Sequence, residues 1–198
     1  MPHTSVNPDP AKAALRTELR AARDGFVSDL APGERVRLEE QAARHLAPLI
    51  EGAGCIAFYQ ALGSELDCSV AIVAAARLGM VVALPHVDDS GTVMRFLRWV
   101  PGDRLERGWR RLFQPRSESQ EITPDTIVAP LLGFDSCGWR IGQGAGFYDR
   151  AFAACPGAKK IGLGWSVQQR PAIAHDARDV PLDMIVTEAG VIRRNGTI

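Results

Sequence analysis

The sequence predicts an α/β protein, a three-layer α/β/α sandwich with a mostly parallel sheet. Short apolar runs alternate with stretches of helical periodicity, which is typical of βαβ units and of a parallel sheet covered by helices on both faces. The chain has 198 residues and 46% of them are hydrophobic, which is enough for the core of one domain. We therefore expect a disordered lead over residues 1–9 and a single domain over residues 10–198.

Two helices are expected at the start of this domain. Leu15 and Leu19 recur at helical spacing within residues 11–24, and a second helix fits residues 32–49. The first strand is the apolar run over residues 55–59.

The rest of the chain continues this alternation. Gly79 ends a helix, and Pro85 follows a buried run of aliphatic residues that reads as a strand. Expected helices cover residues 69–78 and 148–154, and expected strands cover residues 81–84, 94–99, 127–132, 160–163 and 184–186. No regular structure is expected over residues 101–124 or 133–146. In such sheets ligands bind at the carboxyl ends of the parallel strands, so the loops there are the candidates for function.

Composition excludes several classes of protein. Lys plus Arg equals Asp plus Glu at 23 each, so no global field attracts nucleic acid or an anionic membrane. There is no amino-terminal apolar segment of a secretory signal and no run of about 18 apolar residues. The four scattered cysteines have no metal-site spacing and are expected to be free thiols. We expect a cytoplasmic monomer that binds neither nucleic acid nor membranes.

The most informative stretch is the glycine-rich loop that precedes the helix expected at residue 148. Gly142, Gly144 and Gly146 alternate, so backbone N–H groups can approach a ligand closely, and the positive end of the helix points to the same place. Arg140 adds a cation, and Asp149 lies within reach of a metal ion held on an anion's oxygens. This combination predicts a nucleoside triphosphate with magnesium.

The loop matches neither of the common phosphate signatures. A Walker A loop requires Gly-Lys-Ser/Thr where this chain has Gly146-Phe147-Tyr148, and a dinucleotide fingerprint requires its third glycine at Phe147. A glycine-rich turn without a ligand is the alternative. The length of the irregular segment favours function, because long loops within compact domains are usually functional or disordered.

Together with motifs elsewhere, this loop resembles the 5-formyltetrahydrofolate cyclo-ligase family, also called 5,10-methenyltetrahydrofolate synthetase. The resemblance rests on Gly133-Phe134-Asp135, Gly138, Arg140, the three glycines and Tyr148-Asp149, on Lys12 to Arg16, on Glu65, and on Gly162 to Trp165, Gln168, His175-Asp176, Asp183 and Thr187-Glu188. It covers nearly the whole chain and implies a sheet of the sugar-phosphate isomerase and CoA-transferase type. It also implies the substrates ATP and a reduced folate, with Mg²⁺ as cofactor.

The implied reaction is the ATP-dependent cyclisation of 5-formyltetrahydrofolate to 5,10-methenyltetrahydrofolate, with release of ADP and phosphate. The formyl oxygen attacks the γ-phosphate of ATP and gives an imidate phosphate. N10 then closes the ring and phosphate leaves. Such a reaction requires positioning and charge neutralisation more than a nucleophilic side chain.

The resemblance assigns roles residue by residue. Contacts to ATP are expected from Lys12, Arg16, Arg140, Ile141, Gly142, Gln143, Gly144, Ala145, Gly146, Phe147 and Tyr148. Contacts to folate are expected from Gln60, Glu65, Gln143, Gly144, Ala145, Gly146, Phe147 and Trp165. Arg140 and Lys12 are the expected catalytic cations, and Asp149 and Asp176 are the expected metal ligands.

Each role has a simpler alternative. Lys12 and Arg16 also fit a solvated helix face, Glu65 an exposed loop acid, Asp149 a helix-dipole charge and Asp176 a turn acid. The chain departs from the family pattern at Gln143, Ala145 and Gln114. A folate- or nucleotide-binding paralogue with lost or altered turnover, or a sugar-phosphate isomerase-like enzyme, therefore stays as an alternative function.

Five arginines gather in the irregular segment, namely Arg104, Arg107, Arg110, Arg111 and Arg116. A solvated loop is the simpler interpretation, because exposed charges usually do nothing specific. Alternatively, they attract the anionic polyglutamate tail of cellular folates through a field that salt screens.

Overall fold

A seven-stranded sheet forms the centre of the molecule. The computed structural model describes residues 10–177 and 179–194, so the predicted disordered lead lies outside the described residues. Neighbouring strands follow the order β11-β10-β9-β6-β1-β2-β3, parallel from β10 to β2, with β3 and β11 added antiparallel at the two edges. These strands are β1 (Cys55–Ala57), β2 (Val81–Val87), β3 (Met94–Arg98), β6 (Thr126–Pro130), β9 (Lys159–Leu163), β10 (Met184–Thr187) and β11 (Gly190–Arg193). The predicted mostly parallel sheet is confirmed.

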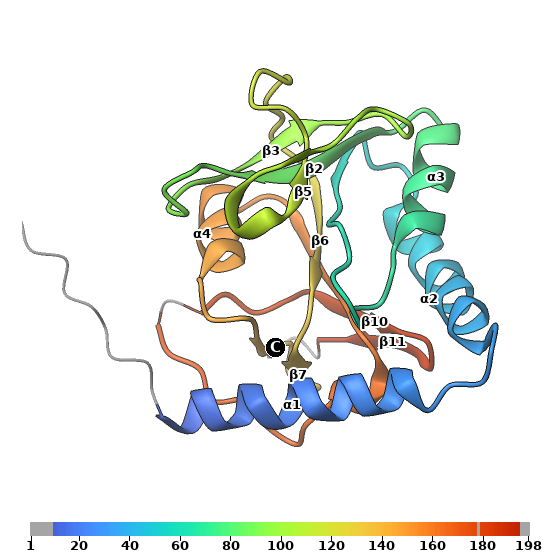
Figure 1. The fold of residues 1–198 in the computed structure, drawn as a ribbon, viewed down its shortest axis with the longest axis vertical. Helices are drawn as coiled ribbons and strands as arrows, with labels where there is room; N and C mark the ends of the chain where they lie inside the picture. Colours follow the sequence, from blue (N-terminus) through green and yellow to red (C-terminus); the bar gives the residue numbers. More distant parts are fainter. Residues whose placement is uncertain (1–9, 178, 195–198) are drawn as a thin grey trace, which may run out of the picture.

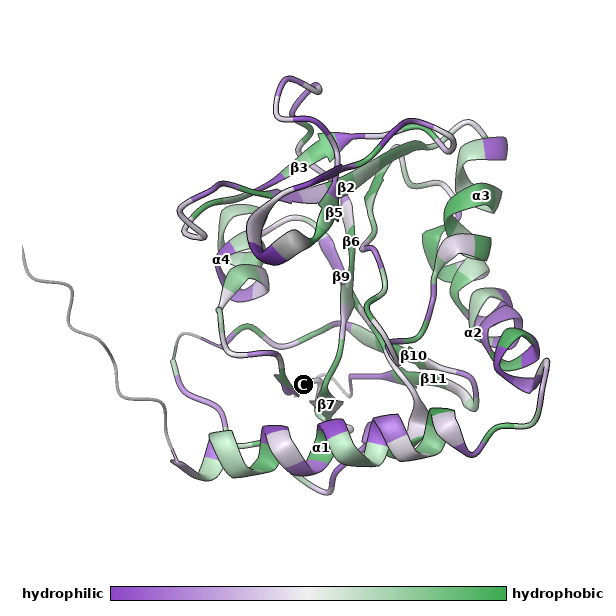
Figure 2. Cartoon of the chain, in the orientation of Figure 1, coloured by the Kyte–Doolittle hydropathy of each residue, from purple (hydrophilic) through white to green (hydrophobic). Residues whose placement is uncertain are grey.

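Helices cover both faces of the sheet (Figure 1). Helices α2 (Glu34–Ile50) and α3 (Ser69–Arg77) lie on one side, and α4 (Phe147–Ala154) lies on the other. Successive strand residues divide between the two cores, as the pleat requires: Ile56 packs with the α2 and α3 residues, and Ala57 packs with those of α4. Figure 2 shows hydrophobic residues along the strands and hydrophilic residues on the outer turns of α2. The predicted three-layer α/β fold is therefore confirmed.

Helix α1 (Pro10–Ser28) belongs to neither face. It crosses the carboxyl ends of the strands (Figure 1). Leu19 anchors it there, because this fully buried side chain packs with Leu132 and Ile141, which follow β6, and with Ile173. The backbone of Gly133 passes close below, since a Cβ added at this glycine would lie 2.5 Å from Cδ1 of Leu19.

The segment over residues 133–146, expected to lack regular structure, contains a short hairpin of β7 (Gly133–Phe134) and β8 (Arg140–Ile141). Two-residue strands are too short to show alternation in a sequence, so the prediction was wrong there.

Asp135 holds the turn of this hairpin. Its buried carboxylate accepts backbone N–H bonds from Cys137 at 2.9 Å and from Trp139 at 3.0 Å. The other oxygen accepts from the backbone N–H of Ile173 at 2.8 Å, which ties the hairpin to the strap over residues 170–180. The Asp of the Gly-Phe-Asp motif therefore shapes the backbone that leads into the glycine loop.

The arginine-rich segment is also more regular than expected. It contains β4 (Glu106–Arg107), the 3-10 turn η1 (Trp109–Arg111) and β5 (Phe113–Gln114). A second 3-10 turn, η2 (Ser166–Gln168), lies elsewhere in the chain, after β9. Gln114 is buried and pairs through its amide with both the N–H and the carbonyl of Val87, each at 3.1 Å. Backbone partners far away in sequence, not local periodicity, create this order.

None of the helices in the two described ranges is long and apolar enough to cross a membrane. Cys55, Cys68, Cys137 and Cys155 are free thiols, as expected.

Candidate active site

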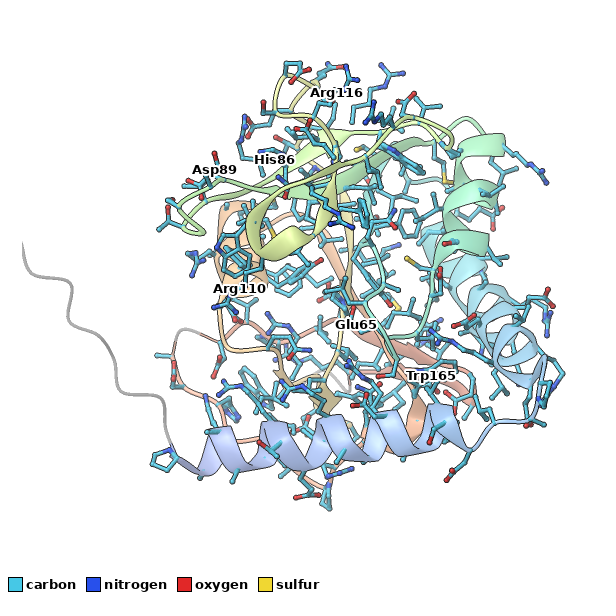
Figure 3. The ribbon with its side chains drawn as sticks, viewed as in Figure 1. Glu65, His86, Asp89, Arg110, Arg116 and Trp165 are labelled. Carbon is cyan, nitrogen blue, oxygen red and sulfur yellow. The ribbon has the colours of Figure 1, made fainter. Side chains whose placement is uncertain are left out.

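The candidate site lies where α1 passes over the loops that follow β1, β6 and β9. Figure 3 shows Glu65 and Trp165 in this space between the sheet and α1. The glycine loop over residues 142–146 faces the same helix, as its hydrogen bonds to α1 show. The carboxyl ends of the parallel strands are the expected place for a ligand in this type of sheet.

Each glycine of the loop has its own role. Gly144 and Gly146 have positive φ values of 100° and 66°, which favour glycine, and Gly146 begins α4. Gly142 has open space around the position of an added Cβ. The loop therefore combines a glycine-dependent backbone with an open position at its start.

The loop is bound to α1 by arginine side chains. Nε of Arg16 donates to the carbonyl of Gly142 at 3.0 Å, and a guanidinium N–H of Arg20 donates to Oε1 of Gln143 at 2.7 Å. The four cations Lys12, Arg16, Arg20 and Arg23 follow one another on one side of α1 at spacings of three and four residues. The fold brings Arg16 to the glycine loop, whereas Lys12 contacts acids that follow residue 175.

Lys12 is held by acids from the strap over residues 170–180. Its Nζ lies 3.1 Å from Oδ2 of Asp179 and 3.7 Å from Oδ2 of Asp176. Asp179 also accepts the backbone N–H of Asp176 at 2.8 Å. The sequence interpretation chose Asp176 and missed Asp179; no signal in a single sequence separates two acids three residues apart in a turn.

Arg140 and Asp149 form a buried ion pair. Two guanidinium N–H groups of Arg140 donate to Oδ1 of Asp149, at 2.9 and 2.8 Å, and the Arg140 side chain is only 6% exposed. The backbone N–H of Val180 also points to this oxygen at 3.4 Å, which places Asp149 beside Asp179. Oδ1 of Asp149 therefore accepts from both the Arg140 guanidinium and the backbone after Asp179.

The carboxylates near Lys12 and Arg140 do not form a dedicated metal cage among the described residues. Among residues 10–177 and 179–194 there is no group of three or more His, Cys, Asp or Glu placed to hold a metal ion. Mg²⁺ usually takes one or two carboxylates together with phosphate oxygens and waters. Asp149 accepts from the backbone N–H of Val180, the residue after Asp179, and Asp176 is the more exposed acid at 46% of its side chain.

Glu65 is buried, so the interpretation as an exposed loop acid does not fit. It is 6% exposed, and its Oε2 accepts the backbone N–H of Leu62 at 3.0 Å. Burial raises the pKa of this carboxyl above its ordinary value, while the Leu62 N–H, the charge of Arg23 and a hydrogen bond from Gln143 act in the opposite direction. Gln143 of the glycine loop therefore lies close enough to Glu65 to influence its pKa.

Arg23 was missed by the sequence interpretation. Its side chain is 6% exposed, and one guanidinium nitrogen lies 3.6 Å from Oε1 of Glu65. The spacing of seven residues from Arg16 was a signal for a shared helix face.

Aromatic residues surround the site but differ in exposure. Trp165 is fully buried, packs against Phe26 and donates its indole N–H to the carbonyl of Ser64 at 2.8 Å. Phe147 is half-buried and meets Trp109 of η1 edge to face, with 5.2 Å between the ring centroids. Tyr148 is half-buried, and burial and the charge of Glu65 raise the pKa of its phenol.

The remaining candidates frame these groups. Gln60 is half-buried just after β1, and Ala145 is exposed in the loop, where its carbonyl accepts a bond from Arg150 at 3.0 Å. The Ile141 side chain lies in the core below α1, which leaves its backbone for a ligand. Gln168 is fully buried and bonds the backbone of Leu131 and Leu132, so it fixes a loop. His175 stacks on Trp139 with 3.6 Å between the ring centroids.

Comparison with known proteins agrees with this layout. The model of the 5-formyltetrahydrofolate cyclo-ligase family matches residues 8–188. The 5-formyltetrahydrofolate cyclo-ligase of Escherichia coli (strain K12) is 28% identical over 172 residues, which cover 82% of this chain and 94% of that protein. The one from Mycolicibacterium smegmatis is 31% identical over 147 residues, 71% of this chain and 74% of the relative.

Solved structures resemble the chain along nearly its whole length. The NMR structure of 5,10-methenyltetrahydrofolate synthetase from Aquifex aeolicus has a TM-score of 0.80 and 27% identity, and covers 94% of both chains. The Mycoplasma pneumoniae synthetase has a TM-score of 0.71 at 22% identity, which shows the shared fold. The family match and these relatives lead to one conclusion: the chain belongs to the 5-formyltetrahydrofolate cyclo-ligase family.

Proposed function

We propose that this chain catalyses the ATP-dependent cyclisation of 5-formyltetrahydrofolate to 5,10-methenyltetrahydrofolate, with release of ADP and phosphate. One observation carries the proposal beyond the family match: α1 brings a cationic, glycine-lined anion site and a buried carboxylate together. Gln143 lies between the two, because its Oε1 accepts from Arg20 at 2.7 Å and its side chain lowers the pKa of Glu65. A single active site can therefore hold a polyphosphate beside a heterocycle.

The polyphosphate would lie along the glycine loop. The backbone N–H groups over residues 142–146, the start of α4 and the cations Lys12 and Arg16 all suit anionic oxygens. Arg140 would fix the first turn of α4 through Asp149 and add positive potential. Mg²⁺, when bound, would neutralise charge on the phosphates, and Asp149 with Asp179 or Asp176 would hold it. Lys12 would then exchange its acidic partners for phosphate.

The folate would be recognised at Glu65. A pterin ring presents ring and amino N–H donors, which a carboxylate accepts in pairs. Phe147 offers an aromatic face nearby, and Gln60 follows β1 on the same edge. Trp165 is buried and donates its indole N–H to the carbonyl of Ser64, so we propose that it supports the loop that carries Glu65. A direct contact between Trp165 and folate stays a prediction.

The reaction would then proceed without a nucleophilic side chain. The N5-formyl oxygen attacks the γ-phosphorus while the bond to the bridging oxygen of ADP breaks, which gives an imidate phosphate. N10 adds to the formyl carbon and loses its proton to solvent, and phosphate leaves with the former formyl oxygen. Positioning and charge neutralisation by the chain would lower the barrier.

A coupled assay tests this proposal. The absorbance of methenyltetrahydrofolate and the release of ADP are followed together, with ATP or Mg²⁺ omitted as controls. We expect equimolar products only in the complete mixture. Binding of both ligands without turnover would identify a regulatory paralogue instead, and conversion of a substrate without ATP would identify an isomerase-like enzyme.

The metal assignment has its own test. Asp149→Asn and Asp179→Asn should each raise the Mg²⁺ concentration that gives half-maximal rate by about tenfold or more, since each removes one of the few charged ligands. Asp89→Asn, an exposed acid in the turn after β2, is the matched control. An unchanged Mg²⁺ requirement in both site variants would show that these acids are structural.

We also propose that the enzyme acts in the cytoplasm and that it is a monomer. Sedimentation of the purified chain would check the monomeric state.

A further inference from the structure

Arg23 is buried in an unusual way for a helix arginine. Its Nε donates to Oγ of Ser64 at 2.9 Å, and Ser64 in turn hydrogen-bonds to Asp24. A second guanidinium nitrogen, Nη1, is buried and has no hydrogen-bond partner among the described residues. That nitrogen lies 3.6 Å from Oε1 of Glu65, just beyond hydrogen-bond distance.

Stability alone does not explain such a group. Burying a guanidinium and a carboxylate removes both from water, and their attraction compensates for this only when the geometry is good and the remaining donors are satisfied. Here one donor is unsatisfied and the ion pair is loose. Apolar residues at both positions 23 and 65 would fill the same space without any buried charge, so a functional reason for the pair of Arg23 and Glu65 is indicated.

We propose that Arg23 is a positioning residue that keeps Glu65 ionised and oriented to accept the paired N–H donors of the pterin ring. This inference rests on the proposed function and deepens it. Nη1 of Arg23 is buried beside Glu65, so Arg23 would act on the folate through the Glu65 carboxylate. The ligand class follows from the chemistry: a flat heterocycle with two adjacent N–H donors, which a carboxylate binds and a neutral carboxylic acid binds poorly.

The other groups around Glu65 do not replace Arg23. The titratable and charged neighbours come from α1, α2, the loop after β1 and α4, and they are Arg23, Asp24, Arg35, Tyr59, Asp67, Cys68 and Tyr148. Arg35 donates to the backbone carbonyl of Glu65 and to the side chain of Glu39. Burial raises the pKa of the Tyr59 and Tyr148 phenols and of the Cys68 thiol, so these three stay neutral. Arg23 is thus the cation at the carboxylate.

The direction of the pH effect follows from the charges. Burial raises the pKa of Glu65, and the positive charge of Arg23 lowers it again. Without this charge the carboxyl would take up a proton at a higher pH. Since the protonated form loses one acceptor, the weakening of folate binding on the acid side would begin at a higher pH.

Arg23→Gln and Arg23→Lys test the proposal. For Arg23→Gln we expect the acid limb of kcat/KM for 5-formyltetrahydrofolate to move up by about 1–3 pH units, the range for a carboxyl that loses a nearby opposite charge. At neutral pH the KM for the folate should rise about tenfold, while kcat and the KM for ATP change less than about threefold, because the ATP contacts lie elsewhere. In Arg23→Lys the acid limb of kcat/KM should return most of the way to its position in the unmodified chain. Arg77→Gln, at the exposed end of α3, is the control.

The Glu65→Gln background separates positioning from folding. Glutamine does not titrate, so Arg23→Gln should change folate affinity less than about twofold when Glu65 is already glutamine. Calorimetry with 5-formyltetrahydrofolate and no ATP gives this comparison independently of turnover. The double variant leaves no unpaired carboxylate in the core, so it stays informative even if Arg23→Gln alone fails to fold.

Two results would overturn the inference: an acid limb that does not move in a folded Arg23→Gln protein, or an equal loss of folate affinity in the presence and absence of the Glu65 carboxylate. A failure of the proposed function looks different, because the unmodified chain would then show no turnover of 5-formyltetrahydrofolate at any pH.

Discussion

Gly142 offers a clean probe of the phosphate site at the scale of single residues. An added Cβ meets nothing within 4 Å, and its φ is not positive. We expect Gly142→Ala to change the free energy of unfolding by less than about 0.5 kcal/mol. The KM for ATP should nevertheless rise about tenfold to a hundredfold, because a methyl group would hold the phosphates away from the backbone. Thermal unfolding and initial rates measure the two quantities.

Gly144→Ala is the companion variant. Its φ of 100° disfavours any residue with a Cβ, so this change should lower stability as well as ATP use. An unaltered KM for ATP in Gly142→Ala would mean that the loop amides at this position do not approach the nucleotide.

The candidate residues differ in how far the sequence could predict them. The alternating glycines and the pair Lys12 and Arg16 have local spacing that indicates an anion site. Arg23 and Asp179 owe their place to partners distant in the chain: Arg23 bonds Ser64 from 41 positions away, and Lys12 bonds Asp179 from 167 positions away. Local patterns carry no information on such pairs.

Helix α1 is the element on which the site depends. Leu19 is fully buried against residues that follow β6. We expect Leu19→Ala to lower the free energy of unfolding by about 2–5 kcal/mol, the range for a large core residue that leaves a cavity. The KM for ATP should rise as well, because α1 carries Lys12 and Arg16. Chemical denaturation and initial rates give both values.

Thr17→Ala, two positions earlier on the exposed side of α1, should change stability by less than about 0.5 kcal/mol. A Leu19→Ala protein as stable as this control would show that α1 is not anchored through Leu19.

At the level of elements, prediction worked where a pattern was long enough. Helices α2 and α3 and the central strands begin and end within a few residues of their expected limits. Strand β11 and the β7–β8 hairpin were not predicted, because β11 is short at the sheet edge and the hairpin depends on the three bonds that Asp135 accepts. Tertiary contacts decide such elements.

The whole molecule has a formal net charge of zero, so any attraction for an anionic tail must be local. A groove beside β4 and β5 is lined by three arginines and two acids, together with the exposed ring of Phe113, and therefore carries a small excess of positive charge; the charged residues are Arg104, Glu106, Arg107, Arg116 and Glu118. We expect a polyglutamylated folate to have a higher kcat/KM than the monoglutamate at low ionic strength, by about 1.5- to 5-fold for each arginine engaged. The advantage should decline as salt screens the field.

Arg107→Ala/Arg116→Ala should reduce this advantage, and Arg37→Ala on the exposed side of α2 should not. An identical tail preference in all three proteins at every salt concentration would leave the arginines as a solvated surface.

The overall architecture was the most predictable feature. Alternating apolar runs and helical periods define a parallel sheet with helices on both faces, because each element must bury its apolar side. The path of α1 across the strand ends was not predictable. Its amphipathic pattern is compatible with any apolar surface, and only the assembled sheet provides the one formed by Leu132, Ile141 and Ile173.

The contact between Lys12 and Asp179 has a consequence for the order of events during synthesis. The first helix leaves the ribosome long before its partners, which lie 126 positions later at Gly142 and 167 positions later at Asp179. Closing such long loops is slow compared with forming local helices. The sheet core can therefore begin to assemble on the nascent chain, whereas under the proposed assignment nucleotide binding would wait until the strap over residues 170–180 has emerged. A translation product that stops before this strap would carry every glycine of the loop and still lack the acids that face Lys12.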